Sequence, residues 1–267
     1  MDGLGYMPAA SMVCMACSLA VSFILPLGLA LWARRRGGRW RAFALGAAVF
    51  PVFAMVLESM AHRVILGGPA GGVLQGSVWL YALYAGLMAG IFEETGRFLA
   101  FTLLKGRGGA GRPADALMYG AGHGGAEAIL LVGAANVSNL LLSFWLNAGT
   151  LEAHLGTMTP EAVQSLSQAV NTPSLSYLWG GAERIVAVAI HLALSVLVYA
   201  SAGRGGKRWL FPTAIALHAG VDACAVLAAA ALPLWAVELT VLVWAAALVF
   251  LARQVWTGKL GKIPERT

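Results

Sequence analysis

Long apolar stretches separated by short polar connections make up most of the chain. A helix needs roughly 20 apolar residues to cross the hydrocarbon core of a bilayer, which is about 30 Å thick. Stretches of this length lie near residues 9–33, 40–66, 77–104, 114–146, 177–203, 209–231 and 233–256. The fourth is longer than one crossing needs, which indicates a tilted helix, a broken helix or two shorter elements. The pattern predicts an all-α fold, a polytopic membrane helix bundle of about seven transmembrane helices that forms a single transmembrane domain over residues 1–267.

The longest polar connection, residues 147–176, contains signals for a further helix. Thr159 is a typical N-cap residue, Pro160 suits the first helical position and Glu161 suits the first turn. Apolar residues then recur at helical spacing, at Val163, Leu166 and Val170. The segment predicts a short amphipathic helix at the membrane surface, either in a structured loop or as a gate over an active site.

Composition agrees with a chain embedded in lipid. Of the 267 residues, 59% are hydrophobic and 11% are charged, which is far from the balance of a soluble domain. The first ten residues, MDGLGYMPAA, lack a positively charged region, so the first apolar stretch is expected to be a retained transmembrane helix. We expect a multi-pass protein in the plasma membrane of a bacterium or archaeon.

The basic residues predict the orientation of the bundle. Most of the 18 Lys and Arg residues lie in four clusters: Arg34, Arg35, Arg36, Arg39 and Arg41; Lys105, Arg107 and Arg112; Arg204, Lys207 and Arg208; and Arg253, Lys259, Lys262 and Arg266. Connections 67–76, 147–176 and 232–233 contain no Lys or Arg. The positive-inside rule therefore puts these connections and the N-terminus outside, and the C-terminus in the cytoplasm. Topology and anionic lipid headgroups account for the net charge of +6, so no nucleic-acid partner is expected.

Several ionisable side chains interrupt the apolar stretches. Each costs roughly 2.5–3.5 kcal/mol at the centre of a bilayer, so a functional role is expected. At 1.5 Å per residue, seven of them lie about 14–20 Å from the cytoplasmic ends of their helices. They are Glu93, Glu94, His123, Glu127, His191, His218 and Asp222. We expect these seven to form one polar layer inside the bilayer, whereas Glu58 and Glu183 lie nearer the outer surface by the same count.

Two of these histidines have a carboxylate one helical turn away. His123 and Glu127 are four residues apart, as are His218 and Asp222, so each pair shares a helix face. A carboxylate in this position can orient the imidazole and raise its basicity, or the two groups can simply neutralise each other in lipid. Small residues beside these groups would let the helices approach closely: Gly86, Gly90, Gly120, Gly122, Gly124 and Gly125.

Four motifs in this region resemble those of a known family. They are F-E-E-T-G-R at Phe92–Arg97, Y-G-A-G-H-G-G-A-E at Tyr119–Glu127, G-A-E-R-I-V-A-V-A-I-H at Gly181–His191 and H-A-G-V-D at His218–Asp222. In this order, over roughly residues 90–225, they are similar to the YhfC family of intramembrane peptidases. That family is similar to the CAAX-processing and bacteriocin-processing membrane proteases, with Glu-Glu-x-x-x-Arg, aromatic-x-x-x-His and His-x-x-x-Asn/Asp motifs. This chain departs from the first motif, because two residues instead of three precede Arg97.

The resemblance implies hydrolysis of a peptide bond in a membrane-associated peptide or protein. In a glutamate mechanism, Glu93 matches the water-activating position, while His123 and His218 would hold the water and polarise the carbonyl group. The departure in the first motif leaves the choice between Glu93 and Glu94 open, because an Arg97 paired with Glu93 at four residues would leave Glu94 free. The resemblance further implies that Asp222 orients His218, and that Arg97, Glu127 and Tyr119 have orienting or substrate-binding roles.

A metal mechanism is the alternative that the same resemblance implies. His123, His191 and His218 would then hold one Zn²⁺, with a fourth position open to water and a glutamate as the base. A glutamate mechanism would need no metal. The sequence leaves both open.

Two other classes of function also fit the residues. Proton-coupled or small-solute transporters place Asp, Glu and His side chains near the middle of the bilayer. This chain has no recognisable inverted repeat, since its acidic and histidine motifs cluster from the second to the sixth apolar stretch. A catalytically silent scaffold or immunity protein on the same fold is the remaining alternative.

Overall fold

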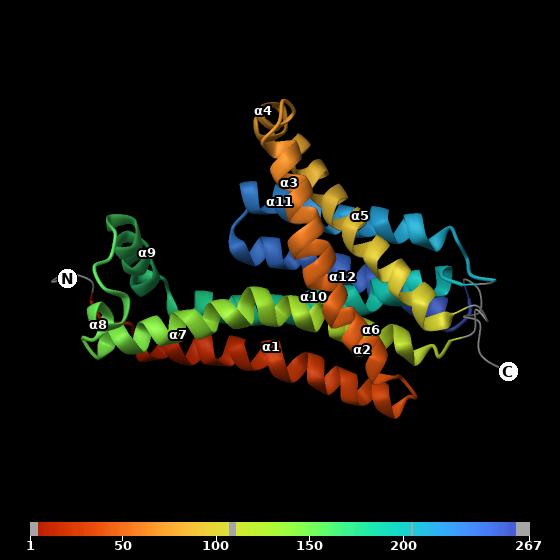
Figure 1. Cartoon of the computed structure of the whole chain (residues 1–267), viewed down its shortest axis with the longest axis horizontal. Helices are drawn as coiled ribbons and strands as arrows, with labels where there is room; N and C mark the ends of the chain where they lie inside the picture. The colour runs from red at the N-terminus through yellow and green to blue at the C-terminus, as the bar shows by residue number, and fades with distance from the viewer. Residues whose placement is uncertain (1–4, 107–110, 204, 260–267) are drawn as a thin grey trace. The chain divides into compact units, whose positions relative to one another are not determined.

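A computed structural model describes residues 5–106, 111–203 and 205–259, and the regular secondary structure in these ranges is helical (Figure 1). Four basic residues used to predict the orientation, Arg107, Arg204, Lys262 and Arg266, lie outside the described residues. The elements in chain order are α1 (Ala9–Arg35), α2 (Trp40–Phe50), the π-helix η1 (Pro51–Glu58), α3 (Ser59–Leu66), α4 (Gly71–Gln75), α5 (Val78–Lys105), α6 (Ala114–Glu127), the π-helix η2 (Ala128–Gly133), α7 (Ala134–Asn147), α8 (Leu151–Leu155), α9 (Pro160–Asn171), α10 (Ser174–Ser201), α11 (Leu210–Ala231) and α12 (Leu234–Trp256).

Six helical segments in the described ranges are long and apolar enough to cross a membrane. They are Ala9–Arg35, Trp40–Leu66, Ala114–Asn147, Ser174–Ser201, Leu210–Ala231 and Leu234–Trp256. The predicted polytopic membrane bundle is thereby confirmed. Helix α5 has 28 residues but carries Glu93, Glu94 and Arg97, and it is not among the six. A seventh crossing and the orientation of the bundle therefore stay predictions.

Two of the long helical segments each contain a π-helical section between α-helical sections. The fourth predicted stretch consists of α6, η2 and α7, so a π-helical section interrupts the α-helix. The second contains η1, which begins at Pro51, where the proline ring removes the backbone N–H that an α-helix would use. Glu58 is the last residue of η1, and Glu127 directly precedes η2. Since π-helical turns often occur at functional sites, both glutamates are of interest.

The chain divides into two compact units, and the predicted single domain stays a prediction. The first unit comprises Met1–Leu25 and Ala128–Ile185, and the second comprises Pro26–Glu127 and Val186–Thr267. The boundaries fall within α1, at the start of η2 and within α10.

The first unit contains the predicted amphipathic helix, which forms as α9 (Pro160–Asn171). The Thr159 hydroxyl accepts a hydrogen bond from the Ala162 N–H at 3.3 Å, and Pro160 occupies the first turn. Leu166 is buried and packs in a small apolar cluster with Leu151. The capping signals in the sequence therefore predicted the correct start of this helix.

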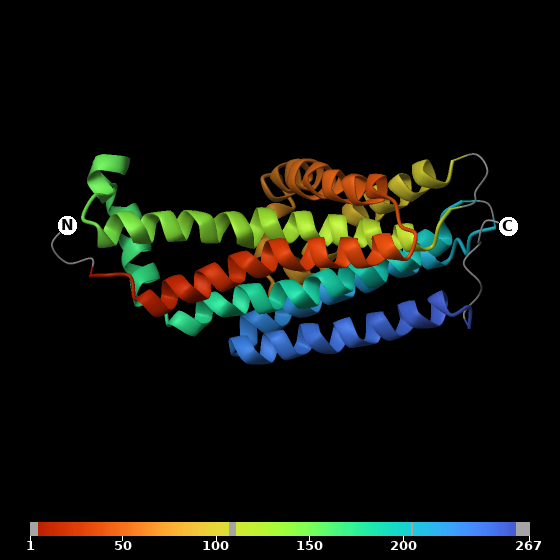
Figure 2. The same cartoon turned by 90° about the horizontal axis from the view of Figure 1, so that it is seen from below.

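Close contacts at glycines hold the helices of the second unit together. A Cβ atom at Gly86 of α5 would lie 2.3 Å from the Ala219 carbonyl oxygen of α11, and one at Gly122 of α6 would lie 2.1 Å from the Phe43 carbonyl oxygen of α2. Such spacing leaves no room for a side chain, which confirms the close approach predicted at these positions. Helices α11 and α12 form an antiparallel hairpin beside this group (Figure 2).

We expect Gly122→Ala to destabilise the second unit, because the new methyl group would meet backbone that cannot move aside. Overpacking of this kind typically costs about 1–3 kcal/mol. Gly28→Ala in α1 is a matched control, since a Cβ built there has no atom within 4 Å other than those of the adjoining backbone of its own helix. Thermal unfolding of the two purified variants in one detergent checks the prediction. Equal melting temperatures would contradict the tight α2–α6 contact.

Candidate metal centre

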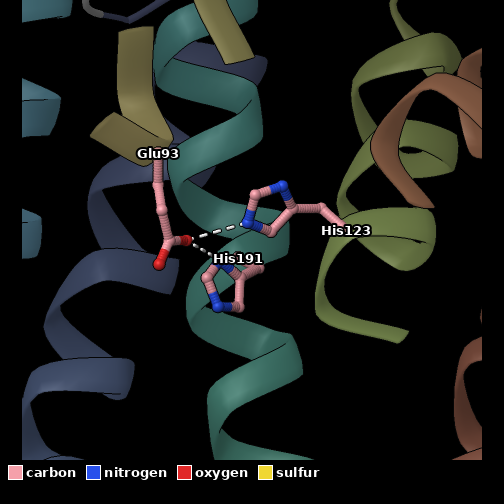
Figure 3. A group of neighbouring side chains, drawn as sticks. All are labelled: Glu93, His123 and His191. Atoms are coloured by element: carbon pink, nitrogen blue, oxygen red, sulfur yellow. Dashed lines mark hydrogen bonds and ion pairs between the residues drawn. The ribbon is translucent and has the colours of Figure 1, made fainter. Parts of the chain in front are cut away.

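Three side chains from three helices meet in the buried interior of the second unit (Figure 3). They are Glu93 of α5, His123 of α6 and His191 of α10, and one ligand atom from each lies within 4.8 Å of the other two. Glu93 Oε2 is 2.8 Å from His123 Nε2 and 4.0 Å from His191 Nδ1. None of the three is more than 7% exposed, so their polar atoms need partners among each other, neighbouring groups, ordered water or a bound ion.

Glycines in α6 bring the two imidazoles together. A Cβ atom at Gly120 would lie 2.8 Å from the Leu192 Cα atom, and one at Gly124 would lie 3.3 Å from the His191 Cβ atom. Because these glycines stand three residues before and one residue after His123, α6 can lie directly against α10. The ring centroids of His123 and His191 are consequently 4.8 Å apart.

Both ring nitrogens of His191 have partners. Arg97 Nη2 lies 3.1 Å from Nδ1, and the Glu127 carboxylate contacts Nε2. A guanidinium can only donate, so Nδ1 accepts from Arg97 and Nε2–H donates to Glu127. The Glu127 carboxylate therefore binds Nε2 of His191, while Nδ1 of the same ring faces Glu93. It is the arrangement commonly found behind a metal-bound histidine.

A second polar cluster adjoins the first. Glu94 Oε1 lies 2.8 Å from His218 Nδ1, and His218 Nε2 lies 3.5 Å from Asp222 Oδ2. Glu94 is fully buried, whereas the Asp222 side chain is 35% exposed. The His218 and His191 rings are 5.7 Å apart, so the two clusters are neighbours.

Arg97 links the two clusters and is itself completely buried. Its Nε lies 2.9 Å from Glu94 Oε2, while Nη1 donates to the His191 carbonyl oxygen at 2.8 Å and to the Ser195 hydroxyl at 2.5 Å. The Glu94 carboxylate provides the opposite charge. Arg97 thus ties α5 to α10 at the level of the site.

The donor set fits a divalent metal ion. Two imidazoles and one carboxylate are ligands that zinc uses in catalytic sites, where a fourth position stays open. Arg97 would retain three other acceptors if Nδ1 of His191 were taken by an ion, so the change would leave it paired. The described part of the chain therefore contains a buried Glu93, His123 and His191 group that is compatible with a metal ion.

All the predicted site residues lie in one connected region, but some pair differently than their spacing indicated. His218 is bonded to Glu94 and Asp222, and it is outside the group of possible metal ligands found among the described residues. The predicted three-histidine set therefore stays a prediction. The predicted His218–Asp222 pair is present.

Two pairings that helical spacing allowed are not the ones that the structure shows. Glu127 contacts His191 instead of His123, which is bonded to Glu93. Arg97 pairs with Glu94, three residues away, and leaves Glu93 to α6. Glu93 and Glu127 thus pair with histidines on neighbouring helices, whereas Arg97 keeps a carboxylate partner on its own helix. Tyr119 stacks on His123 with ring centroids 5.8 Å apart, and its hydroxyl is 3.5 Å from Nδ1.

Sequence reasoning missed a further cluster, formed by Glu58, His62 and Tyr84. His62 lies 3.2 Å from Glu58 Oε1 through Nε2 and 2.7 Å from the Tyr84 hydroxyl through Nδ1. The four-residue spacing of Glu58 and His62 was the available signal.

These features define a polytopic membrane protein with a buried site built from glutamates and histidines. The family described as YhfC intramembrane metalloprotease matches residues 21–243, which include the whole site. A Bacillus subtilis (strain 168) protein described as an uncharacterized membrane protein YhfC is 39% identical over 223 residues, which cover 81% of this chain and 84% of that protein. No solved structure matches the chain. The chain belongs to the YhfC intramembrane metalloprotease family.

Four of the five histidines provide a direct test of the ligand set. We expect His123→Ala and His191→Ala each to abolish stoichiometric metal in the purified protein, because each removes a ligand from the buried group. We expect His218→Ala to retain the metal, and so should His154→Ala, which changes an exposed residue of α8. Elemental analysis by mass spectrometry measures the result. Loss of metal in His218→Ala as complete as in His123→Ala would instead support the three-histidine set.

Glu127→Gln tests the carboxylate behind His191. The neutral amide would hold the imidazole more weakly, and we expect metal affinity to fall about 10- to 100-fold. Competition with a chelator measures the affinity. Glu152→Gln, an exposed change in α8, is the matched control and should leave the affinity unchanged. An unaltered affinity in Glu127→Gln would show that His191 does not need this partner.

Proposed function

We propose that the protein hydrolyses a peptide bond of a membrane-associated peptide or protein, with one Zn²⁺ held by Glu93, His123 and His191. The observation that supports this most directly is the buried meeting of these three side chains from α5, α6 and α10. Hydrophobic packing does not explain why a carboxylate and two imidazoles are buried together, because burying polar groups costs free energy. Membership of an intramembrane metalloprotease family agrees with this reading.

Each ligand would be held by a group outside the metal position. Glu127 would keep His191 in the tautomer that leaves Nδ1 facing Glu93, and Tyr119 would support His123 through ring stacking and its hydroxyl. When bound, a zinc ion supplies Lewis acidity, which polarises a carbonyl group and acidifies water. In this proposal the three donors would need little rearrangement to hold the ion, because their ligand atoms lie within 4.8 Å of one another.

The neighbouring cluster supplies proton chemistry in this proposal. Hydrolysis adds the oxygen of water to the carbonyl carbon, breaks the C–N bond and moves a proton to the leaving amine. His218, held between Glu94 and Asp222, would carry that proton or donate a hydrogen bond to the carbonyl oxygen. The partly exposed Asp222 marks the side from which water or substrate would approach. Glu94 and Arg97 would be positioning residues.

The proposed substrate is a segment that reaches the site within the bilayer. In a transmembrane helix the backbone N–H and C=O groups are bonded to each other, which protects the peptide bond. The segment would have to unwind locally before its carbonyl group could face His218. Substrates with Gly, Pro or polar residues in the membrane segment would be favoured, because their helices open at lower cost.

Cleavage of transmembrane peptides by the purified protein in liposomes tests the proposal. We expect His123→Ala to abolish cleavage with loss of metal, and His218→Gln to lower kcat by about 100-fold or more with the metal retained. Product masses identify the broken bond, and elemental analysis is made on the same samples. His154→Gln is the control and should cleave at the normal rate.

Transport of a proton or small solute is the outcome that would overturn the proposal. Transport would be indicated if liposomes took up a proton or small solute and this uptake required Glu93 and His218. The added peptides would at the same time remain uncleaved. Cleavage that survives both His123→Ala and His218→Gln would point to a contaminating protease.

A further inference from the structure

An apolar groove of about 480 Å³ lies on the second unit, away from the polar site. Helices α6, α10 and α12 and the end of α1 form it. Most of its lining is aliphatic: Leu117, Ala189, Leu192, Ala193, Val196, Val249 and Ala252. Ala189 and Val196 are seven residues apart on α10, so the groove follows that helix for roughly 10 Å. Its volume is in the range of small-molecule sites.

Two arginines and two tryptophans complete the lining. Arg36 directly follows α1 and Arg253 lies in the last turn of α12, so both come from the C-terminal ends of their helices. The Arg36 guanidinium lies 4.3 Å from the centroid of the Trp32 ring, and Trp256 is the last residue of α12. Tryptophan is enriched where a membrane protein passes from hydrocarbon to headgroups.

The charge of the groove is unbalanced. No acidic side chain is among its lining residues, and neither arginine has an ion-pair partner in the described part of the chain. An apolar surface with two uncompensated guanidinium groups complements a ligand with an apolar tail and an anionic head. A phosphate is especially suitable, because a guanidinium can bind two of its oxygens at once.

We propose that this groove binds one anionic phospholipid, with an acyl chain along α10 and the phosphate at Arg36 and Arg253. A peptide segment is a poorer occupant, because its backbone N–H and C=O groups would find almost no partners along the aliphatic lining. A zwitterionic lipid would fill the groove but would bring no net negative charge. Basic pockets between transmembrane helices are known to recognise anionic headgroups.

The groove and the candidate metal centre use different faces of α10. Ala189, Leu192 and Ala193 line the groove, whereas His191 between them points to Glu93. A bound acyl chain would therefore pack behind the segment that carries His191. The lipid site does not depend on the proposed peptidase activity, and its test uses no substrate.

The experiment compares lipid retention by native mass spectrometry. The purified protein is mixed with equal amounts of dioleoylphosphatidylglycerol and dioleoylphosphatidylcholine, and bound lipids are counted as detergent is removed in the gas phase. We expect one phosphatidylglycerol to be retained in preference to phosphatidylcholine. Removing each arginine should weaken that preference about fivefold. The Arg36→Gln/Arg253→Gln variant should therefore retain the two lipids almost equally.

A matched double variant separates a specific site from general surface charge. Arg35→Gln/Lys259→Gln also removes two exposed positive charges near the ends of α1 and α12, but neither residue lines the groove. It should keep the preference for phosphatidylglycerol. Loss of the preference in this control as well would overturn the proposal, and so would an unchanged preference in Arg36→Gln/Arg253→Gln.

Filling the groove tests the acyl part of the site. Ala189→Phe adds a ring to the aliphatic lining without changing charge, and it should reduce retention of phosphatidylglycerol at least as much as loss of one arginine. Thermal unfolding shows whether the variant is folded. A folded Ala189→Phe protein with undiminished retention would show that the lipid binds elsewhere.

Discussion

Mutual neutralisation of buried ionisable groups is the constraint on which this structure depends. An isolated charge is expensive inside a membrane protein, so such groups persist where they pair with one another. Arg97 provides the positive charge that pairs with Glu94 in this site. It also contacts the ring and the carbonyl oxygen of His191 and the hydroxyl of Ser195. Removing this one cation would leave Glu94 buried beside His218 with less compensation and would release α5 from α10.

Tight helix packing makes the pairing possible. Glycines at the contacts of α5 with α11 and of α6 with both α2 and α10 bring backbones so close that even a methyl group would not fit. Side chains of ordinary length can then reach across three helices and meet at Glu93, His123 and His191. The glycines thus allow close packing of the helix backbones, and this packing fixes the positions of the ionisable side chains.

The second unit places different chemistry on the two faces of α10. On one face, His191 joins carboxylates and imidazoles in a site suited to a metal ion and to proton transfer. On the other, alanine, leucine and valine line a groove whose lining also includes two arginines. The proposed peptidase site and the proposed lipid site therefore both use this helix.

The sequence alone determined the membrane class, the helical fold, most helix positions and the ionisable residues that meet in the candidate site. These follow from local composition and spacing, because lipid demands long apolar helices and penalises every ionisable residue that is not needed. Tertiary structure alone decided the partners of two glutamates: Glu93 with His123, and Glu127 with His191. Spacing along one helix could not predict them, because close packing offers each side chain a better-placed partner on a neighbouring helix. The same holds for the groove that we propose binds a lipid, because its two arginines are far apart in the chain and line one groove only in the folded protein.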